Sequence, residues 1–275
     1  MLKARRPRRS AVLLGIALGL SVTFLLMGPW RTTVLLLGID RAPQGTAVAR
    51  SDTMILLTIV PPAGYTGMLS LPRDLWVTIP GVGPNRINTA HFFGESQATG
   101  SGADLATATV RENFGLAVDG YARLTWDGIV ESVDALGGLV VDLPTAMSGY
   151  GAGRHRLNGT QALAFVRDRA GTDDFFRMGR GQLFLKAVLR QTANPLSWPR
   201  APLAAAALLR SLDTNLPPWE WPRIAFALMR SGPDGIDSRT ISREMVLPFQ
   251  TAQGAQVLAP NWDRINPMLL EMFGQ

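Results

Sequence analysis

Acidic and basic residues interleave at the ends of three apolar segments near the start of the chain. The segments are LLLGIDR, ARSDT and LSLPRD, and the residues are Asp40, Arg50, Asp52, Arg73 and Asp74. If the three segments are strands, the five side chains come to one edge of one sheet. Carboxylates bind hard divalent cations, and arginines form forked hydrogen bonds with phosphate oxygens. The pattern predicts a site for a cation together with a phosphorylated substrate.

Asp40 and Asp52 stand at the exit of one predicted strand and the entry of the next. If these strands are antiparallel neighbours, the two carboxylates lie close together, and their mutual repulsion calls for a compensating cation. A shared magnesium or manganese ion would meet that need. The alternative is that both acids cap turns. The chain has no cysteine and two histidines, His91 and His155, which argues against a zinc site of the usual composition.

A second group of arginines lies further along the chain. Arg167 and Arg169 form an R-D-R sequence near the end of a predicted helix. Arg177 and Arg180 are three residues apart, and therefore on one face, of the next helix, which begins near Asp174. Taken alone, these residues could be solvated helix faces with weak local ion pairs. The arginines follow apolar segments that must be buried, which favours a shared site.

These residues need a sheet and helices to position them. Apolar and β-branched runs predict strands over residues 32–38, 52–60, 65–71 and 75–79, whose close spacing indicates antiparallel pairing. Further strands are predicted over 120–125 and 139–143, with edge strands over 235–241 and 256–258. Helices are predicted over 104–114, 126–136, 160–166, 174–191, 201–211, 219–229 and 262–273. The fold class is α/β: an α-β-α sandwich with a central mixed, largely antiparallel sheet.

The net charge of +6 does not indicate a nucleic-acid-binding protein. Five of the 27 basic residues lie before residue 10, and the remaining 22 are balanced by 21 acidic residues. The excess charge therefore belongs to an N-terminal tail and not to a basic face of the folded domain. No motif of the known nucleic-acid-binding folds accompanies it.

Residues 11–30 follow this tail and carry no charge over twenty positions. That length suffices for a transmembrane helix. The segment lacks the small-residue cleavage pattern of a signal peptide, so an uncleaved anchor is expected. The basic residues 1–10 should stay in the cytoplasm, and residues 31–275 should form one extracytoplasmic catalytic domain. The predicted location is the cell membrane, with a single pass.

Seven motifs, in order, give the chain a family resemblance. They are GIDR, RSDTM, SLPRDLWVTIPG, RINTAH, the segment over residues 120–144, HRLNGTQALAFVRDR and DDFFRMGRGQ, which together span about residues 32–189. With the short basic tail and the single anchor, the chain resembles the LytR-CpsA-Psr family of cell-envelope phosphotransferases.

The resemblance implies a reaction and a set of residues. Family members move a glycopolymer from a polyprenyl-diphosphate carrier to the muramic acid 6-hydroxyl of peptidoglycan, and polyprenyl monophosphate leaves. The implied catalytic residues are Asp40, Asp52, Arg50, Arg73 and Asp74, with Mg²⁺ or Mn²⁺ on Asp40 and Asp52. The implied substrate-binding residues are Arg50, Arg73, Arg86, Asn88, Arg167, Arg169, Asp174, Arg177 and Arg180. Asp74 would be either the base for the acceptor hydroxyl or the partner that holds Arg73.

The chain departs from the family pattern at one position. Members often read R-Q-Q after the last arginine pair, whereas this chain reads Arg180-Gly181-Gln182. Two other functions stay open: a hydrolase that uses water as the acceptor, and a non-catalytic envelope regulator that binds polyprenyl phosphates. The sequence does not identify the glycopolymer or the acceptor strand.

Overall fold

A six-stranded sheet forms the centre of the protein. The computed structural model describes residues 9–39, 48–168 and 174–274. The order of the strands is β10 (Asp237–Thr240), β3 (Tyr65–Ser70), β2 (Ser51–Val60), β1 (Thr32–Ile39), β6 (Gly120–Leu124) and β9 (Leu212–Thr214). Two neighbouring pairs, β1 with β6 and β3 with β10, are parallel, and the others are antiparallel. The mixed, largely antiparallel sheet predicted from the sequence is therefore confirmed.

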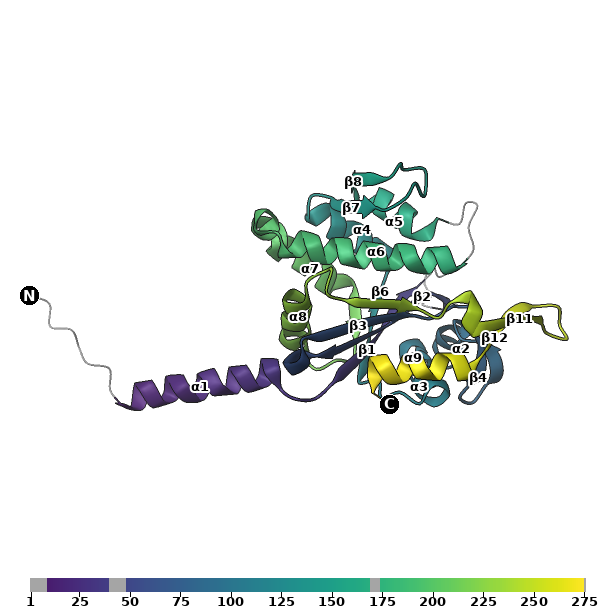
Figure 1. Cartoon of the computed structure of the whole chain (residues 1–275), viewed down its shortest axis with the longest axis horizontal. Coiled ribbons are helices and arrows are strands. Elements are labelled where there is room, and N and C mark those ends of the chain that lie inside the picture. The colour runs from purple at the N-terminus through teal and green to yellow at the C-terminus, as the bar shows by residue number, and fades with distance from the viewer. Residues whose placement is uncertain (1–8, 40–47, 169–173, 275) are drawn as a thin grey trace, which may run out of the picture.

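Helices cover both faces of this sheet (Figure 1). One face carries α2 (Thr89–Gln97), α3 (Gly102–Phe114) and α9 (Trp262–Phe273). The other carries α4 (Trp126–Ala135), α5 (Gly159–Arg167), α6 (Asp174–Ala193), α7 (Ala201–Ser211) and α8 (Glu220–Ser231). Side chains alternate across a strand, so Leu35 and Leu37 of β1 pack in the first layer while Val34 and Leu36 pack in the second. This alternation produces the α-β-α sandwich.

Three small hairpins stand outside the main sheet. They are β4 (Trp76–Ile79) with β5 (Gly83–Arg86), β7 (Leu139–Leu143) with β8 (Gly153–Leu157), and β11 (Val246–Gln250) with β12 (Gln256–Pro260). The segment over 75–79 is thus a strand, as predicted, but it pairs with β5 and not with the central sheet. The turn at Gly81 sends the chain back along β4, and its φ of 72° suits glycine. Similarly, the segment over 256–258 pairs with β11, whereas 235–241 contains the predicted edge strand.

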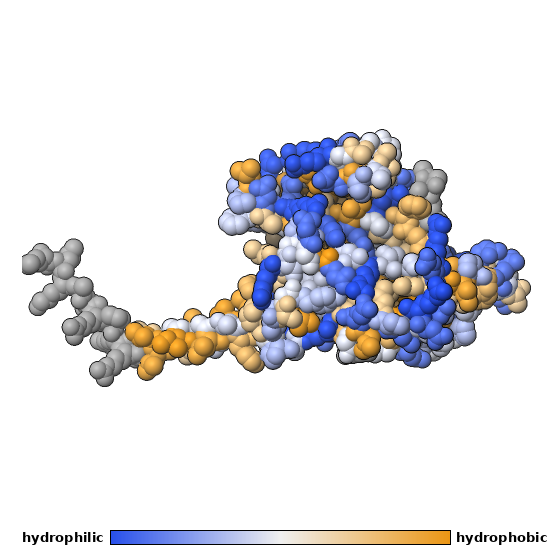
Figure 2. Space-filling model, viewed as in Figure 1, coloured by the Kyte–Doolittle hydropathy of each residue, from blue (hydrophilic) through white to orange (hydrophobic). Residues whose placement is uncertain are grey.

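The first described helix, α1 (Arg9–Met27), projects from one end of the domain (Figure 1). Its large apolar side chains between Val12 and Phe24 are exposed, and Figure 2 shows the helix as an orange band. Across residues 9–39, 48–168 and 174–274, no helix combines the length and the hydropathy that a membrane crossing requires. The predicted transmembrane segment over 11–30 thus remains a prediction, and the helix ends at Met27, before Gly28 and Pro29.

Candidate active site

The end of β1 and the start of β2 lie side by side at the edge of the sheet. Ile39 pairs with Ser51, after a shift of register at Gly38 and Ile39. The strand that carries Asp52 therefore begins beside the end of β1, as predicted from the sequence. Asp40, the other predicted metal ligand, lies outside the described residues, as does Arg169. The side chain of Asp174 is likewise not described.

A chain of ion pairs links the acids and arginines on this edge. Arg73 Nη1 lies 2.9 Å from Asp52 Oδ1, and Arg73 Nε lies 3.5 Å from Asp74 Oδ2. The other oxygen of Asp74 lies 3.1 Å from Arg86 Nε. Asp74 therefore bridges two arginines. This arrangement suits the holding of Arg73 better than the role of a base for an acceptor hydroxyl, since both carboxylate oxygens face guanidinium groups.

Asn88 forms backbone hydrogen bonds to two segments of this edge. Its side chain is buried, its backbone N–H donates to the carbonyl of Arg73 at 3.3 Å, and its own carbonyl accepts from the backbone N–H of Ser51 at 3.2 Å. The residue thus joins the loop that carries Arg73 to the start of β2. Asn88 was expected to line the cleft, and the structure gives it this connecting position in the buried layer.

The second wall of the site comes from α5 and α6. Asn158 and Gln161 form a capping box that begins α5, and the buried Phe165 and Val166 fix the face that the helix turns to the core. Arg167 consequently emerges at the last turn, with its guanidinium carbon 5.6 Å from the centre of the Trp126 ring. The Trp126 ring therefore contacts the Arg167 guanidinium at the wall of the site.

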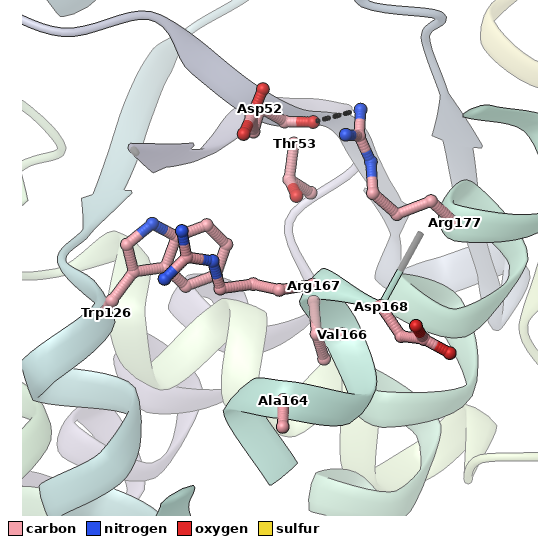
Figure 3. A pocket seen from close by; sticks show the side chains of 8 residues that line it. All are labelled: Asp52, Thr53, Trp126, Ala164, Val166, Arg167, Asp168 and Arg177. Carbon is pink, nitrogen blue, oxygen red and sulfur yellow. Dashed lines mark hydrogen bonds between the residues drawn. The ribbon is translucent and has the colours of Figure 1, made fainter. Parts of the chain in front are cut away.

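Arg177 reaches the same space from the first turn of α6. Its Nη2 donates to the backbone carbonyl of Asp52 at 3.1 Å, although the residue is 125 positions away in sequence. Arg167 with Trp126 and Arg177 lie on opposite sides of a cavity of about 450 Å³ (Figure 3). The cavity is lined by Asp52, Thr53, Trp126, Ala164, Val166, Arg167, Asp168 and Arg177. Two arginines and two acids therefore face one space.

Arg180 and Gln182 connect α6 to neighbouring elements through hydrogen bonds. Arg180 is buried and donates to the backbone carbonyl of Asp168, so it ties α6 to the end of α5. Gln182 Nε2 donates to Ser70 Oγ at 2.9 Å and to the Arg239 carbonyl at 2.7 Å. The amide of Gln182 is thus engaged with the sheet and does not replace the glutamine that is missing at Gly181. Arg50 is exposed at the entry of β2.

A narrow apolar cavity continues from the polar one. The two share Thr53, Trp126 and Val166. The apolar part is lined in addition by Leu36, Leu37, Gly38, Ile55, Ala122, Leu124, Ile129, Gly181, Phe184 and Leu185. It runs between the sheet and α6, away from the arginines. A charged head and an apolar tail of one ligand could therefore occupy adjoining spaces.

A buried polar network lies behind the site, and its residues are not among those predicted from the sequence. His91 Nδ1 donates to the Ala49 carbonyl at 2.8 Å, and Arg123 Nη1 donates to His91 Nε2 at 2.9 Å. Arg123 also pairs with Glu95 and with Asp213. Burial lowers the pKa of His91. Burial alone would raise the pKa of Glu95, but hydrogen bonds from the Gly100 amide and Arg123 outweigh it and lower that pKa.

This network holds the segment that leads to Arg50. His91 contacts the carbonyl of Ala49, the residue before Arg50, and its two ring partners define a neutral imidazole with the proton on Nδ1. A histidine within RINTAH was visible in the sequence. Its partners Arg123 and Asp213 are distant in sequence, and no local pattern connects them.

A divalent cation fits part of this arrangement. The Asp52 carboxylate supplies the oxygen ligand that magnesium prefers, but one of its oxygens also pairs with Arg73. Among the described residues, no cluster of three or more histidine, cysteine, aspartate or glutamate side chains could hold a metal. An ion at Asp52 would need Asp40 or the oxygens of a substrate as further ligands.

Comparison with known proteins identifies the family of the chain. A sequence model of the LytR_cpsA_psr family matches residues 30–272. The chain belongs to the LytR-CpsA-Psr family. It is 38% identical over 189 residues to the polyisoprenyl-teichoic acid–peptidoglycan teichoic acid transferase TagU of Oceanobacillus iheyensis, a match covering 66% of this chain and 58% of that protein. It is 34% identical over 192 residues to TagU of Halalkalibacterium halodurans, covering 67% and 60%. The matched parts are thus less than two thirds of these relatives' length.

Relatives of this LytR-CpsA-Psr protein that have solved structures share its fold. TagV of B. subtilis superposes with a TM-score of 0.71 at 25% identity, covering 90% of this chain and 99% of that one. A structure titled "TagT bound to LI-WTA" superposes with a TM-score of 0.69 at 25% identity, covering 89% and 91%. The mixed sheet and its helical layers are therefore those of the family.

Proposed function

We propose that the protein is a membrane-anchored phosphotransferase that moves a glycopolymer from a polyprenyl-diphosphate carrier to the muramic acid 6-hydroxyl of peptidoglycan. The observation that carries this proposal is the junction of an arginine-lined cavity with an apolar cavity at Thr53, Trp126 and Val166. A lipid diphosphate has both parts. The names of the TagU relatives, which are peptidoglycan teichoic acid transferases, support the same reaction class.

The polar cavity suits the charge that moves in phosphoryl transfer. The acceptor oxygen forms a bond to the phosphorus nearest the sugar, while the bond from that phosphorus to the bridging oxygen breaks. Polyprenyl monophosphate leaves, and the hydroxyl proton passes to a base or to solvent. Enzymes promote such steps mainly by positioning and by stabilising charge on the phosphoryl oxygens. In this role Arg167 and Arg177 contact the diphosphate from opposite sides of the cavity, Arg73 contacts it from beside Asp52, and Arg50, Arg169 and Arg180 lie around them.

Magnesium or manganese is part of the proposal, on Asp40 and Asp52. Such an ion would neutralise charge on the diphosphate when bound. The residues of the chain then have separate tasks. Asp74 and Arg86 orient Arg73, Trp126 orients Arg167, and Arg180 fixes the approach of α6 to α5. Asp174 has the proposed task of orienting the arginines of α6.

The prenyl tail would occupy the apolar cavity between the sheet and α6. The space there is small, about 80 Å³, compared with about 450 Å³ in the polar cavity. A tail must therefore displace side chains such as Phe184. Gly181 eases this because a Cβ at that position would have no neighbour within 4 Å. The glycine that departs from the family pattern thus borders the space where the tail would lie.

The proposal includes the topology expected from the sequence. Residues 11–30 would cross the bilayer, the basic tail would lie in the cytoplasm and residues 31–275 outside. A donor that is itself anchored in the membrane by its prenyl tail would then be delivered to an anchored enzyme in two dimensions.

Product analysis with purified full-length protein tests the function. The chain is incubated with a polyprenyl-diphosphate-linked glycopolymer and nascent peptidoglycan, and the products are separated with and without acceptor. We expect phosphodiester-linked polymer only when peptidoglycan is present. Loss of product in Arg167→Ala, but not in a control change at the exposed Arg154, ties the reaction to the cavity. Equal release of free polymer without acceptor would mean that the protein is a hydrolase, and no turnover with intact binding would mean a regulator.

A further inference from the structure

One segment of the domain exposes far more apolar surface than its neighbours. Residues 194–209 contain a single charge, at Arg200. Within this segment large apolar side chains are open to solvent, with exposed fractions of 87% at Leu196, 61% at Leu203 and 67% at Leu209. On α7 the buried positions are Ala204 and Ala207, so the helix turns its small residues inward and its leucines outward. This is the reverse of an ordinary surface helix.

The apolar segment lies at the end of the domain from which α1 projects (Figure 1). It follows the C-terminal end of α6 and packs against α4, and α8 contacts α1. Two more exposed apolar side chains, Trp219 and Met229, belong to the ends of α8. Figure 2 shows α1 as an orange band at this end, beside a domain surface on which orange and blue residues are mixed. We call the set of Leu196, Trp198, Leu203, Leu209, Trp219 and Met229 the end face.

The position of α1 relative to this end is fixed by a buried arginine. Arg223 of α8 is completely buried, and its guanidinium stacks on the Trp30 ring at 4.4 Å. It donates to the carbonyl of Gly28 at 3.1 Å and also to the carbonyl of Trp30 and to Thr32 Oγ1. Arg230 adds a hydrogen bond to the Pro61 carbonyl at 2.6 Å and contacts Met27 Sδ at 3.7 Å. The segment between α1 and β1 is therefore packed against α8.

Exposed charges of both signs lie around the end face. Arg200, Arg210 and Arg230 are exposed around α7 and α8, and Asp127 and Glu131 are exposed on α4, against which α7 packs. Three other acids are paired: Asp213 with Arg123, Asp234 with Arg190 and Glu220 with Arg223. Arginine side chains can extend along apolar surface and keep their charged ends in water, which places them well for anionic lipid headgroups. Tryptophan is likewise enriched at membrane interfaces.

We propose that the end face lies on the surface of the bilayer, with its apolar side chains in the interfacial region and its arginines at anionic phospholipid headgroups. The proposal rests on the anchoring part of the proposed function. If α1 enters the membrane, the end of the domain that Arg223 fixes to it must face the lipid, which identifies the occupant of the exposed apolar surface. A second copy of the chain would explain the apolar side chains but not their place around the exit of α1.

This orientation also connects the bilayer to the site. β1 begins with Thr32 at the end of the domain next to α1 and finishes with Ile39 at the site. Its eight residues span about 26 Å at roughly 3.3 Å per residue. The apolar cavity, with Leu36 of β1 and Leu185 of α6, lies between the arginines and the end face. A lipid tail that leaves the bilayer beneath the end face would thus meet an apolar path to the polar cavity.

Site-specific fluorescence in vesicles tests the end face. The chain has no cysteine, so single cysteines can be introduced and labelled in the full-length protein. The positions are Leu203 and Leu209 on the end face, Leu14 on α1 as a positive control, and Leu247 on β11 as a matched control. Leu247 is as exposed as Leu203, at 61%, and lies at the opposite end of the domain. The protein is reconstituted in vesicles of phosphatidylglycerol and brominated phosphatidylcholine, whose bromine quenches only a label in contact with lipid.

We expect labels at Leu14, Leu203 and Leu209 to be quenched by about half or more, since an interfacial helix buries one face among the lipids. The label at Leu247 should keep its fluorescence. Quenching at Leu14 without quenching at Leu203 and Leu209 would overturn the end face and leave the anchor intact. A blue shift at Leu209 without quenching would show a protein partner, and would also overturn it. An unquenched Leu14 would overturn the anchor and the end face together.

Discussion

Arg177 and Asp52 join the two walls of the polar cavity, because the guanidinium of Arg177 donates to the backbone carbonyl of Asp52 at 3.1 Å. The contact leaves the Asp52 carboxylate available to Arg73, which lies 2.9 Å away. One residue of β2 thus connects an arginine from α6 with an arginine from the loop after β3. The walls are positioned relative to each other by the same residues that would contact the substrate.

Replacing Arg177 should therefore damage catalysis more than folding. For Arg177→Lys we expect kcat to fall by about a hundredfold, comparable to the loss of one donor to a developing oxyanion, because lysine cannot form the forked contact. The free energy of unfolding should change by about 1–2 kcal/mol, as for one hydrogen bond to a backbone carbonyl. Steady-state kinetics and urea denaturation measure the two effects. The control is Arg190→Lys on the same helix, which pairs with Asp234 at the surface. Equal effects at both positions would contradict the assignment.

A variant at Asp74 distinguishes a residue that positions Arg73 from one that acts as a base. Its two oxygens face Arg73 and Arg86, so Asp74→Ala should misplace Arg73 and lower kcat by roughly 10- to 100-fold. A positioning residue leaves the shape of the pH–rate profile unchanged, whereas removal of a base abolishes its acid limb. We expect the profile of the variant to be lower and parallel. Disappearance of the acid limb in Asp74→Ala would instead identify Asp74 as the base.

The cation prediction concerns Asp40 and Asp52. In the double variant Asp40→Ala, Asp52→Ala, magnesium-dependent binding of a polyprenyl-diphosphate analogue should weaken by about a hundredfold, or ~2.8 kcal/mol. Calorimetric titration measures this directly, and replacement of the exposed Asp142 provides the control. We expect Mg²⁺ and Mn²⁺ to support binding and Zn²⁺ to be inferior. Unchanged metal dependence in the double variant would refute the site.

The buried His91 should make stability depend on pH. Burial places its folded pKa below the ordinary value of 6.5, so the unfolded chain binds more protons between the two values. The stability contributed by neutral His91 is full above pH 6.5 and declines as the pH falls toward the folded pKa. Glu95, whose pKa is also lowered, adds a decline at still lower pH. In His91→Gln the decline between pH 7 and 5 should be smaller. Denaturation series at several pH values test this, and His155→Gln, at a half-buried position on β8, is the control.

Gly181 allows a test of the apolar cavity. Gly181→Ala should stabilise α6 by up to ~1 kcal/mol, because alanine is the better helix former. Gly181→Leu should fill the cavity and raise the KM for long-chain prenyl donors more than for short ones. The matched control is Gly179→Leu, since a Cβ there also meets nothing within 4 Å but faces a different cavity. Equal effects of both leucines on long-chain donors would contradict the assignment of the tail.

Local patterns were sufficient for most of the secondary structure. The alternation in β1 and the apolar run of β2 identified the central strands, and the capping residue Asn158 marked the start of α5. The path of β4 was not accessible in this way, since pairing with β5 rather than with β3 depends on a turn and on tertiary packing. Helix α2 was missed because its sequence lacks an apolar stripe, and His91 and Glu95 are buried there through polar contacts instead.

The same distinction applies to the candidate site. Asp52, Arg73 and Arg177 could be predicted as site residues because each is a charged residue that directly follows or precedes an apolar segment. Sequence could not show that the backbone of Asn88 and the side chain of Gln182 form hydrogen bonds within the framework, or that Asp74 lies between two arginines. Those relationships depend on distances between segments that are remote in the chain. The contacts of Arg123 with His91 and Asp213 are of this kind as well.

The stacking of Arg223 on Trp30 gives the molecule a fixed reach. A flexible tether would let the catalytic domain swing over a hemisphere and meet acceptors at many heights. With Gly28, Trp30 and Thr32 all bound to one buried guanidinium, the segment that joins α1 to β1 is held against α8. For a protein anchored through α1, the arginine-lined cavity would then stand at one altitude above the lipid, roughly the length of β1. Only glycan strands that pass at that altitude, those next to the membrane, could serve as acceptors.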